Sequence, residues 1–187
     1  MANARSPYGL QPLHTIGGGA PFTISMPMRQ KFQTTKYSTK IYKGQLVLFN
    51  NTIGCGIANA GTNPTAGTVL GVAAAYYPGS VLSTATEIPI WLAKEHIFVA
   101  QIAAATTTKT LADYYMKNMA ITAPAGGSTT TGLSASMLYN ASHTASAPFR
   151  VVGLAQNVGQ TATGAYLNLK GMLNFSVGFD TDAAMHS

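Results

Sequence analysis

Two hydrophobic runs separated by a short polar break stand at the centre of the hydrophobic pattern of this chain. Residues 88–92 (IPIWL) and 97–104 (IFVAQIAA) flank Lys94-Glu95-His96, and the first run holds the only tryptophan, Trp91. Isoleucine, valine, phenylalanine and tryptophan favour a pleated, half-buried surface. Two such runs around a polar corner predict a pair of antiparallel strands at the centre of one β core.

Shorter apolar runs, divided by turns rich in glycine, proline and asparagine, predict further strands on both sides of this pair. These runs are 44–50, 52–60, 68–77, 133–139, 149–155 and 165–178. One short helix is expected in residues 106–120, where Leu111, Tyr115, Met116 and Met119 recur at helical spacing and would pack on the core. The pattern predicts an all-β single domain, jelly-roll-like or barrel-like.

The first 44 residues predict a long extended N-terminal arm rather than a central strand or a long helix. Prolines recur at positions 7, 12, 21 and 27, and Gly17-Gly18-Gly19 interrupts them. Proline fixes φ and removes a backbone donor. Only short extended pieces are expected, around Leu13 and in residues 22–26. The predicted organisation is therefore an arm at 1–44, a β core at 45–178 and a polar tail at 179–187.

Charge is scarce and unevenly distributed along the chain. Charged residues make up 9% of the sequence, against about a quarter in an average domain. Such a surface suits burial against copies of the same chain or against a partner. The first 86 residues hold no Asp or Glu, which favours an acidic partner. Because the basic residues are spread singly, a protein surface is favoured over nucleic acid.

The sequence offers little for catalysis, metal binding or membrane insertion. Glu87 and Glu95 could form a glycosidase pair if a hairpin brought them within about 5–10 Å, but isolated carboxylates on strand ends are usually solvated. The histidines lack ligand spacing, and Cys55, the single cysteine, cannot form an internal disulfide. No segment has the length of a membrane helix or the apolar core of a signal peptide. We expect no enzyme, no cofactor, no metal, and synthesis in a cytoplasm.

The order of several short motifs resembles capsid decoration (cement) proteins of tailed bacteriophages. The opening Met1-Ala2-Asn3 is followed by Gly9-Leu10 and Pro12, then by the glycine step at 17–19. Ile41 to Gly44, Leu70-Gly71-Val72 and Phe98-Val99-Ala100-Gln101 follow in the family's order. The family's frequent acidic residue after the glycine is Gln45 here, and its Asp-Pro pair before the Phe-x-x-Gln strand is replaced by residues 93–95.

The resemblance implies a non-catalytic virion protein that forms homotrimers on the capsid exterior and cements neighbouring major capsid protein subunits. We expect the basic and aromatic residues of the arm to bind the capsid, since Arg and aromatic side chains dominate interface hot spots. These are Arg5, Tyr8, Phe22, Arg29, Lys31, Phe32, Lys36, Tyr37, Lys40, Tyr42 and Lys43. Two alternatives stay open: a carbohydrate-binding β module of a phage tail or fibre that uses Trp91, and, less favoured, a nucleic-acid-binding protein.

Overall fold

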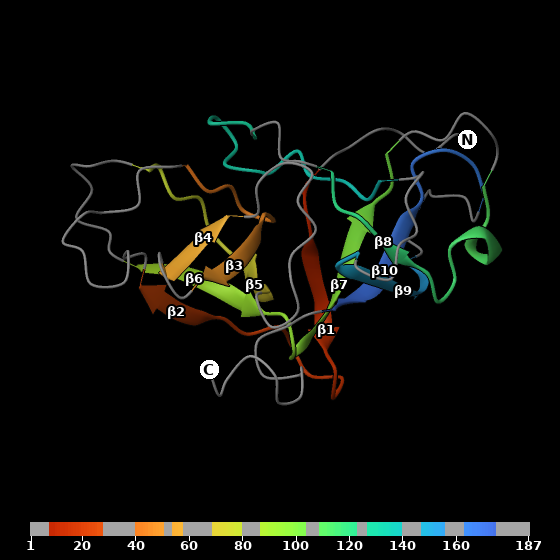
Figure 1. The fold of residues 1–187 in the computed structure, drawn as a ribbon, viewed down its shortest axis with the longest axis horizontal. Coiled ribbons are helices and arrows are strands. Elements are labelled where there is room, and N and C mark those ends of the chain that lie inside the picture. The colour runs from red at the N-terminus through yellow and green to blue at the C-terminus, as the bar shows by residue number, and fades with distance from the viewer. Residues whose placement is uncertain are drawn as a thin grey trace.

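The described part of the chain forms two antiparallel β-sheets, which confirms the all-β prediction (Figure 1). The computed structural model describes residues 8–27, 40–50, 54–57, 69–79, 87–103, 109–122, 127–139, 147–155 and 163–174. Sheet A has the spatial order β1 (Gln11–Thr15), β7 (His96–Gln101), β10 (Asn168–Leu173), β9 (Phe149–Leu154) and β8 (Asn118–Met119). Sheet B has the order β2 (Ile24–Pro27), β6 (Glu87–Leu92), β5 (Val69–Ala73), β3 (Leu46–Asn50) and β4 (Gly54–Ile57).

The central hairpin predicted from the two hydrophobic runs is wrong, although both runs are strands. β6 pairs with β2 and β5, whereas β7 pairs with β1 and β10. The polar break between them is a corner at which the chain passes from sheet B to sheet A. Ala93 is buried there and donates its N–H to the carbonyl of Leu70 (3.0 Å), and the side chain of His96 is also fully buried. The break therefore joins the two sheets.

The N-terminal segment contributes an edge strand to each sheet. The two short extended pieces predicted around Leu13 and in residues 22–26 are confirmed as β1 and β2, and each lies at the edge of its sheet, where proline is tolerated. β1 pairs with β7 on one side of the corner, and β2 pairs with β6 on the other side. Both pairs are antiparallel, so residues 11–27 run alongside residues 87–101 in the opposite direction. We call residues 11–27 the N-terminal ribbon. The predicted arm thus includes strands of both sheets.

The main hydrophobic core lies between the sheets. Leu46 and Val72 of sheet B pack there with Phe98 and Phe149 of sheet A. A second cluster, including Val47 and Leu70, covers the other face of sheet B. Along β3, Leu46 packs in the main core and Val47 in the second cluster, as the strand period requires. β5 contributes Val69 and Val72 to the main core and Leu70 and Ala73 to the second cluster, with the alternation interrupted where the β3–β5 register shifts. Every residue of β5 is buried. In Figure 1 the two sheets lie next to each other, and β1 and β7 are the strands of sheet A that lie nearest to sheet B.

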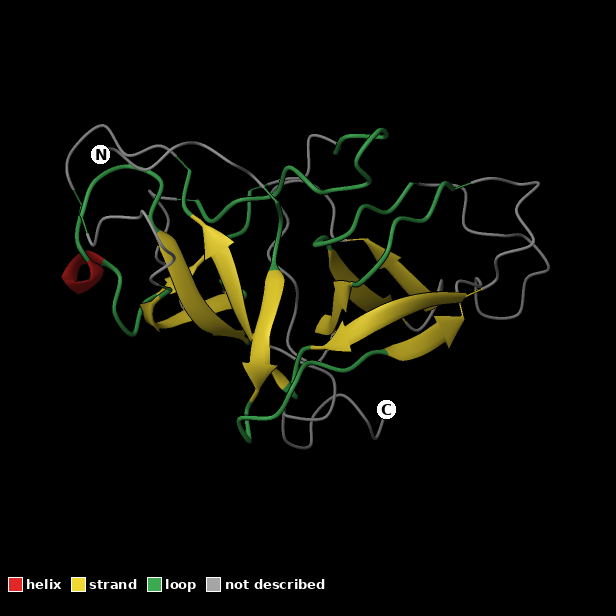
Figure 2. Ribbon diagram, turned by 180° about the vertical axis from the view of Figure 1, so that it is seen from behind, coloured by secondary structure: helices red, strands yellow, loops and turns green. Residues whose placement is uncertain are grey.

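The helix predicted in residues 106–120 is wrong for the described part of that segment. It contains only a 3-10 turn, η1 (Leu111–Asp113), seen at the margin of the molecule in Figure 2. Met116 adopts a left-handed backbone (φ 59°), which cannot continue a right-handed helix, and Met119 is already in β8. None of the helices in the described ranges is long and apolar enough to span a membrane.

The strand predicted at 133–139 is replaced by single backbone bridges. Leu133 is bridged to Lys43, and Leu138 is bridged to Ile102 and Ile121. This segment therefore crosses over several elements instead of following one of them, because each of its bridges goes to a different part of the chain.

Candidate interaction surface

The predicted capsid-binding residues divide into those that the structure describes and those that it does not. Tyr8, Phe22, Lys40, Tyr42 and Lys43 are described. Arg5, Arg29, Lys31, Phe32, Lys36 and Tyr37 lie outside the described residues. Among the described ones, Phe22 and Lys40 are exposed, Tyr8 and Lys43 are half-buried, and Tyr42 is buried. The described members of the set do not form one exposed group.

Tyr42 and Lys43 mainly pack against the body of the protein. The ring of Tyr42 lies 5.4 Å from that of Tyr76, and its N–H donates to the buried side-chain oxygen of Gln45 (2.9 Å). The ammonium of Lys43 lies 5.7 Å from the ring centre of Trp91, a cation–π contact. Trp91 is itself half-buried beside the main core. The Lys43 side chain thus covers one face of the Trp91 ring. That face is not free to stack on a sugar, as the carbohydrate-binding alternative would require.

Two of the motifs that carry the resemblance meet in space. The N–H of Leu10 donates to the carbonyl of Gly44 (2.8 Å). Gly9 (φ 72°) and Gly44 (φ 86°) both have left-handed backbones, in which glycine is favoured. A Cβ on Gly44 would lie 2.6 Å from the carbonyl oxygen of Tyr8. The glycines at these two motifs therefore permit close backbone contact, which is a structural role.

Tyr8 buries a hydroxyl for which no hydrogen-bond partner exists among the described residues. Burial raises the pKa of this phenol from 10.0 to about 12. Folding therefore favours the neutral form of this phenol. The stability that depends on the neutral form is fully present below pH 10 and is lost as the pH rises from 10 toward 12.

We predict that Tyr8→Phe stabilises the protein by about 0.5–1 kcal/mol at pH 7, because it removes an unpaired buried polar group. It should also reduce the alkaline loss of stability between pH 10 and 12. Urea unfolding at pH 7 and pH 11 measures both effects. Tyr115→Phe is the matched control, since that side chain is 55% exposed and its change should be neutral. A destabilised Tyr8→Phe would mean that the hydroxyl has a partner in the native protein.

The N-terminal ribbon carries an exposed apolar surface without charge. Leu13, Ile16 and Phe22 are 45%, 46% and 46% exposed. Residues 8–27 contain no Asp, Glu, Lys or Arg. Several exposed large apolar side chains on one uncharged segment favour an interaction site. Of the predicted residues, only Phe22 belongs to this surface. The contact role was predicted for the basic and aromatic residues of the arm, which include Phe22 but not Leu13 or Ile16.

His96 fixes the ribbon to the corner between the sheets. Its Nε2 accepts the N–H of Phe22 (3.2 Å), and its Nδ1 lies 2.9 Å from the carbonyl oxygen of Leu92. A carbonyl only accepts and an amide N–H only donates, so the ring must be neutral with its proton on Nδ1. The ring of Phe22 lies 5.0 Å from that of His96. His96 is therefore a structural residue, which agrees with the packing interpretation of the histidines.

Residues 115–117 form a second exposed group, which the sequence pattern did not predict. Tyr115 and Met116 are 55% and 48% exposed, although helical spacing had assigned them to core packing. Lys117 follows them directly and is also exposed. No local signal marks this position, because left-handed residues are usually glycine or asparagine and this one is methionine.

No catalytic or metal-binding arrangement is found in the part of the chain that the structure describes. Glu87 begins β6 and Glu95 lies beyond its end. The strand between Glu87 and Leu92 spans about 16 Å, and the hairpin that would have paired the two carboxylates is absent. The described ranges also hold no group of three or more His, Cys, Asp or Glu side chains suited to a metal ion. His143 and His186 lie outside those ranges.

Comparison with known proteins adds no further assignment. Neither protein-family models, nor curated proteins, nor solved structures match this chain. The two exposed surfaces and the resemblance of the sequence motifs are therefore the features that bear on function.

Proposed function

We propose that this chain is a non-catalytic virion structural protein, a capsid decoration (cement) protein of a tailed bacteriophage. In this role it is made in the host bacterial cytoplasm and binds the outside of an icosahedral capsid as a homotrimer. There it stabilises contacts between major capsid protein subunits. Its two sheets would belong to a jelly-roll-like or barrel-like domain, a fold that can carry such a contact surface on its strand edges.

The observation that supports this proposal best is the uncharged N-terminal ribbon. It lies along one edge of both sheets and exposes Leu13, Ile16 and Phe22. Exposed sheet edges are sites where another chain can pair or pack. Pro12 and the irregular register at residues 12–14 interrupt the β1 edge, so side-chain packing fits better than continuous strand pairing. Neighbouring copies or capsid subunits would supply the apolar surface that covers it.

The physical role follows from mass action. A protein that binds only the assembled shell stabilises that state by an amount that grows with its concentration over its Kd. Repeated contacts on one particle also reinforce each other, because each additional contact is made within the same assembly. Modest individual interfaces would therefore suffice. The basic residues of the predicted arm, including Arg29 and Lys36, fit an acidic capsid surface in this role.

The carbohydrate-binding alternative has less support. It relied on Trp91, whose ring packs beside the main core and is approached by Lys43. Enzymatic function has no arrangement of acid and base groups to support it among the described residues. The cement protein is therefore the function that we put forward.

The test compares phage particles with and without this protein under heat and dilution. Particles that contain it should survive at higher temperature, and adding purified protein back should restore the difference. Equal survival would contradict the cementing role. Removal of residues 1–43 would be a poor test of the arm, because it also deletes β1 and β2. Removal of residues 1–7 leaves both strands in place and is the appropriate truncation.

A further inference from the structure

We infer that a cluster of basic and apolar residues at the β8 edge of sheet A, which we call the basic knuckle, binds an acidic protein surface on the capsid. The basic knuckle comprises Lys109, Tyr115, Met116, Lys117 and Arg150. This inference deepens the proposed function, on which it rests for the identity of the partner. It adds a contact face that lies outside the N-terminal arm.

Backbone pairing brings the members of the basic knuckle together. The N–H of Met116 donates to the carbonyl of Val151 (3.0 Å), and the N–H of Val151 donates to the carbonyl of Lys117 (3.0 Å). Asn118 in β8 is the register partner of Arg150 in β9. Residues 115–117 are therefore held against the edge of sheet A next to Arg150.

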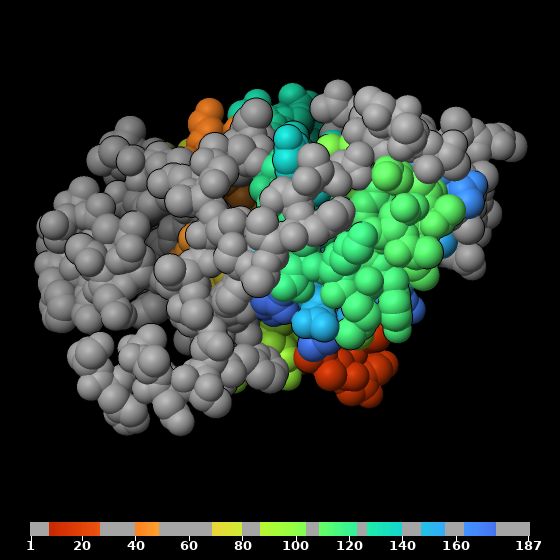
Figure 3. All heavy atoms as spheres, turned by 45° about the vertical axis from the view of Figure 1, so that its right-hand side comes forward, coloured from red at the N-terminus to blue at the C-terminus, as the bar shows by residue number. Residues whose placement is uncertain are grey.

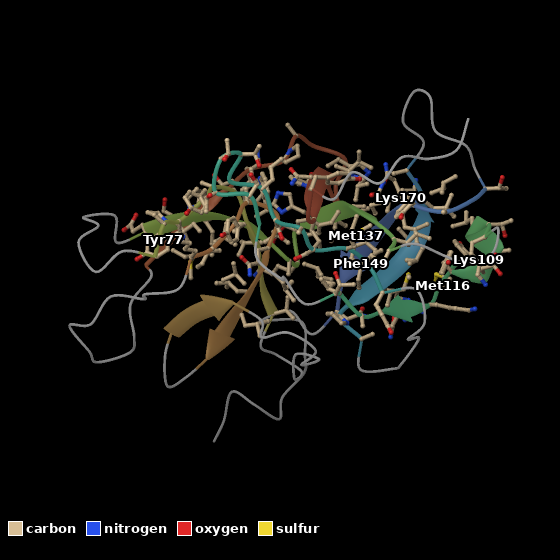
Figure 4. All side chains as sticks on the ribbon, turned by 90° about the horizontal axis from the view of Figure 1, so that it is seen from above. Tyr77, Lys109, Met116, Met137, Phe149 and Lys170 are labelled. Carbon is tan, nitrogen blue, oxygen red and sulfur yellow. The ribbon has the colours of Figure 1, made fainter. Side chains whose placement is uncertain are left out.

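The short turn before the knuckle positions Lys109. The backbone N–H of Thr110 donates to Oδ2 of Asp113 (2.7 Å). The pKa of Asp113 is lowered, mainly by this hydrogen bond and further by the charges of Lys109 and Lys117. Both ammonium groups thus lie within electrostatic reach of the same carboxylate. Figure 4 shows Lys109 and Met116 at one end of the molecule, opposite to Tyr77.

Positive charge exceeds negative charge on this part of the surface. Lys109, Lys117 and Arg150 contribute three cations, and Asp113 is the single carboxylate among them. Within the described ranges, none of these three cations forms a salt bridge. Lys117 and Arg150 are exposed. The surface is therefore complementary to a partner that carries carboxylates.

Exposed apolar side chains lie next to these cations. Tyr115 and Met116 are the most exposed pair of large apolar neighbours in the described chain. Met116 has a left-handed backbone, a conformation that is costly for a residue other than glycine and is often retained at functional sites. In Figure 3 the green surface of residues 109–122 faces the viewer, with the blue surface of β9 and β10 directly below it.

The mixture of side chains favours a protein partner over nucleic acid. Tyrosine, methionine and arginine are enriched at protein interfaces, whose core is apolar and whose rim is polar. Nucleic-acid binding depends on many phosphate contacts along a track of cations. Two large exposed apolar residues next to three cations match the first composition better.

The test measures binding of the complete protein to three probes: empty shells that lack this protein, poly-L-glutamate, and a short duplex DNA. Lys117→Glu and Arg150→Glu reverse exposed charges of the knuckle. Lys94→Glu reverses another exposed lysine, in the corner after β6, and serves as the matched control. Met116→Gly removes an apolar side chain where the backbone already suits glycine, so its Tm should be unchanged or higher.

We expect Lys117→Glu and Arg150→Glu each to weaken shell and poly-L-glutamate binding about tenfold at low salt, whereas Lys94→Glu should have little effect. Met116→Gly should weaken shell binding alone. Shell binding that no knuckle variant reduces would overturn the inference and leave the proposed function standing. Selective binding of poly-L-glutamate without shell binding would support an acidic partner and count against the capsid. Tighter binding to DNA, lost in the same variants, would overturn the protein partner in favour of nucleic acid.

Discussion

Replacing Gly44 with alanine should destabilise the protein by about 3 kcal/mol. The left-handed backbone costs about 1–2 kcal/mol for an L-residue. The new Cβ would also lie 2.6 Å from the carbonyl oxygen of Tyr8 and would push residues 8–10 away. Loss of the Leu10–Gly44 hydrogen bond would add about 1 kcal/mol. Urea unfolding followed by circular dichroism measures the change.

Gly18→Ala provides the matched control for this substitution. Gly18 has nearly the same backbone (φ 85°), but a Cβ there would meet no atom within 4 Å. It should therefore suffer the backbone penalty alone, about 1 kcal/mol. The difference between the two variants isolates the contact between Gly44 and the N-terminal segment. Equal losses would show that this contact does not hold the segment in place.

Replacing His96 with leucine should destabilise the protein by about 2–3 kcal/mol. Leucine fills a similar volume but leaves the Phe22 N–H without its acceptor and the Leu92 carbonyl without the imidazole. Both hydrogen bonds are partly buried, and losing each of them costs about 1 kcal/mol. Phe22 would also lose its ring contact, so the ribbon should separate from the corner. Hydrogen exchange at Phe22 should accelerate together with the loss of stability.

His14→Leu is the control for the loss of a histidine. His14 is half-buried and makes only a local contact in the described chain, from Nδ1 to the carbonyl of Thr15 (2.7 Å). Its replacement should cost less than about 1 kcal/mol. If both variants are equally stable, His96 would not be the element that holds the ribbon to the corner.

Local sequence patterns identified most of the strands, but not β8 and not the partners of any strand. The apolar runs at 44–50, 68–77 and 149–155 contain β3, β5 and β9, and the prolines at 12 and 27 are on edge strands as expected. A polar corner looks the same in sequence whether it closes a hairpin or leads to another sheet. The outcome at residues 93–96 depended on buried contacts with Leu70 and Phe22, which are distant in sequence.

The helix prediction failed because one backbone conformation overruled side-chain spacing. Met116 is left-handed although its side chain does not favour this state. Its N–H is held by the carbonyl of Val151, a partner that no local pattern reveals. The same contact exposes Tyr115 and Met116, so the error in the helix and the missed surface have one cause.

The candidate site was predictable only in part. Charge distribution and proline content directed attention to the N-terminal segment, which exposes Leu13, Ile16 and Phe22. Composition could not distinguish Phe22, which is exposed, from Tyr42, which packs against Tyr76. That difference depends on the tertiary neighbours of each ring. The basic residues at 29, 31 and 36 lie outside the described residues, so their contact role remains a prediction.

We propose that this chain acts by adhesion to a phage shell. A reconstruction of the virion at a resolution that traces the chain would test it most directly. We predict density for three copies around a symmetry axis on the capsid exterior, with the N-terminal ribbon covered by a neighbouring subunit and the basic knuckle against the shell. A chain found away from the capsid, or one with both surfaces facing solvent, would contradict the account.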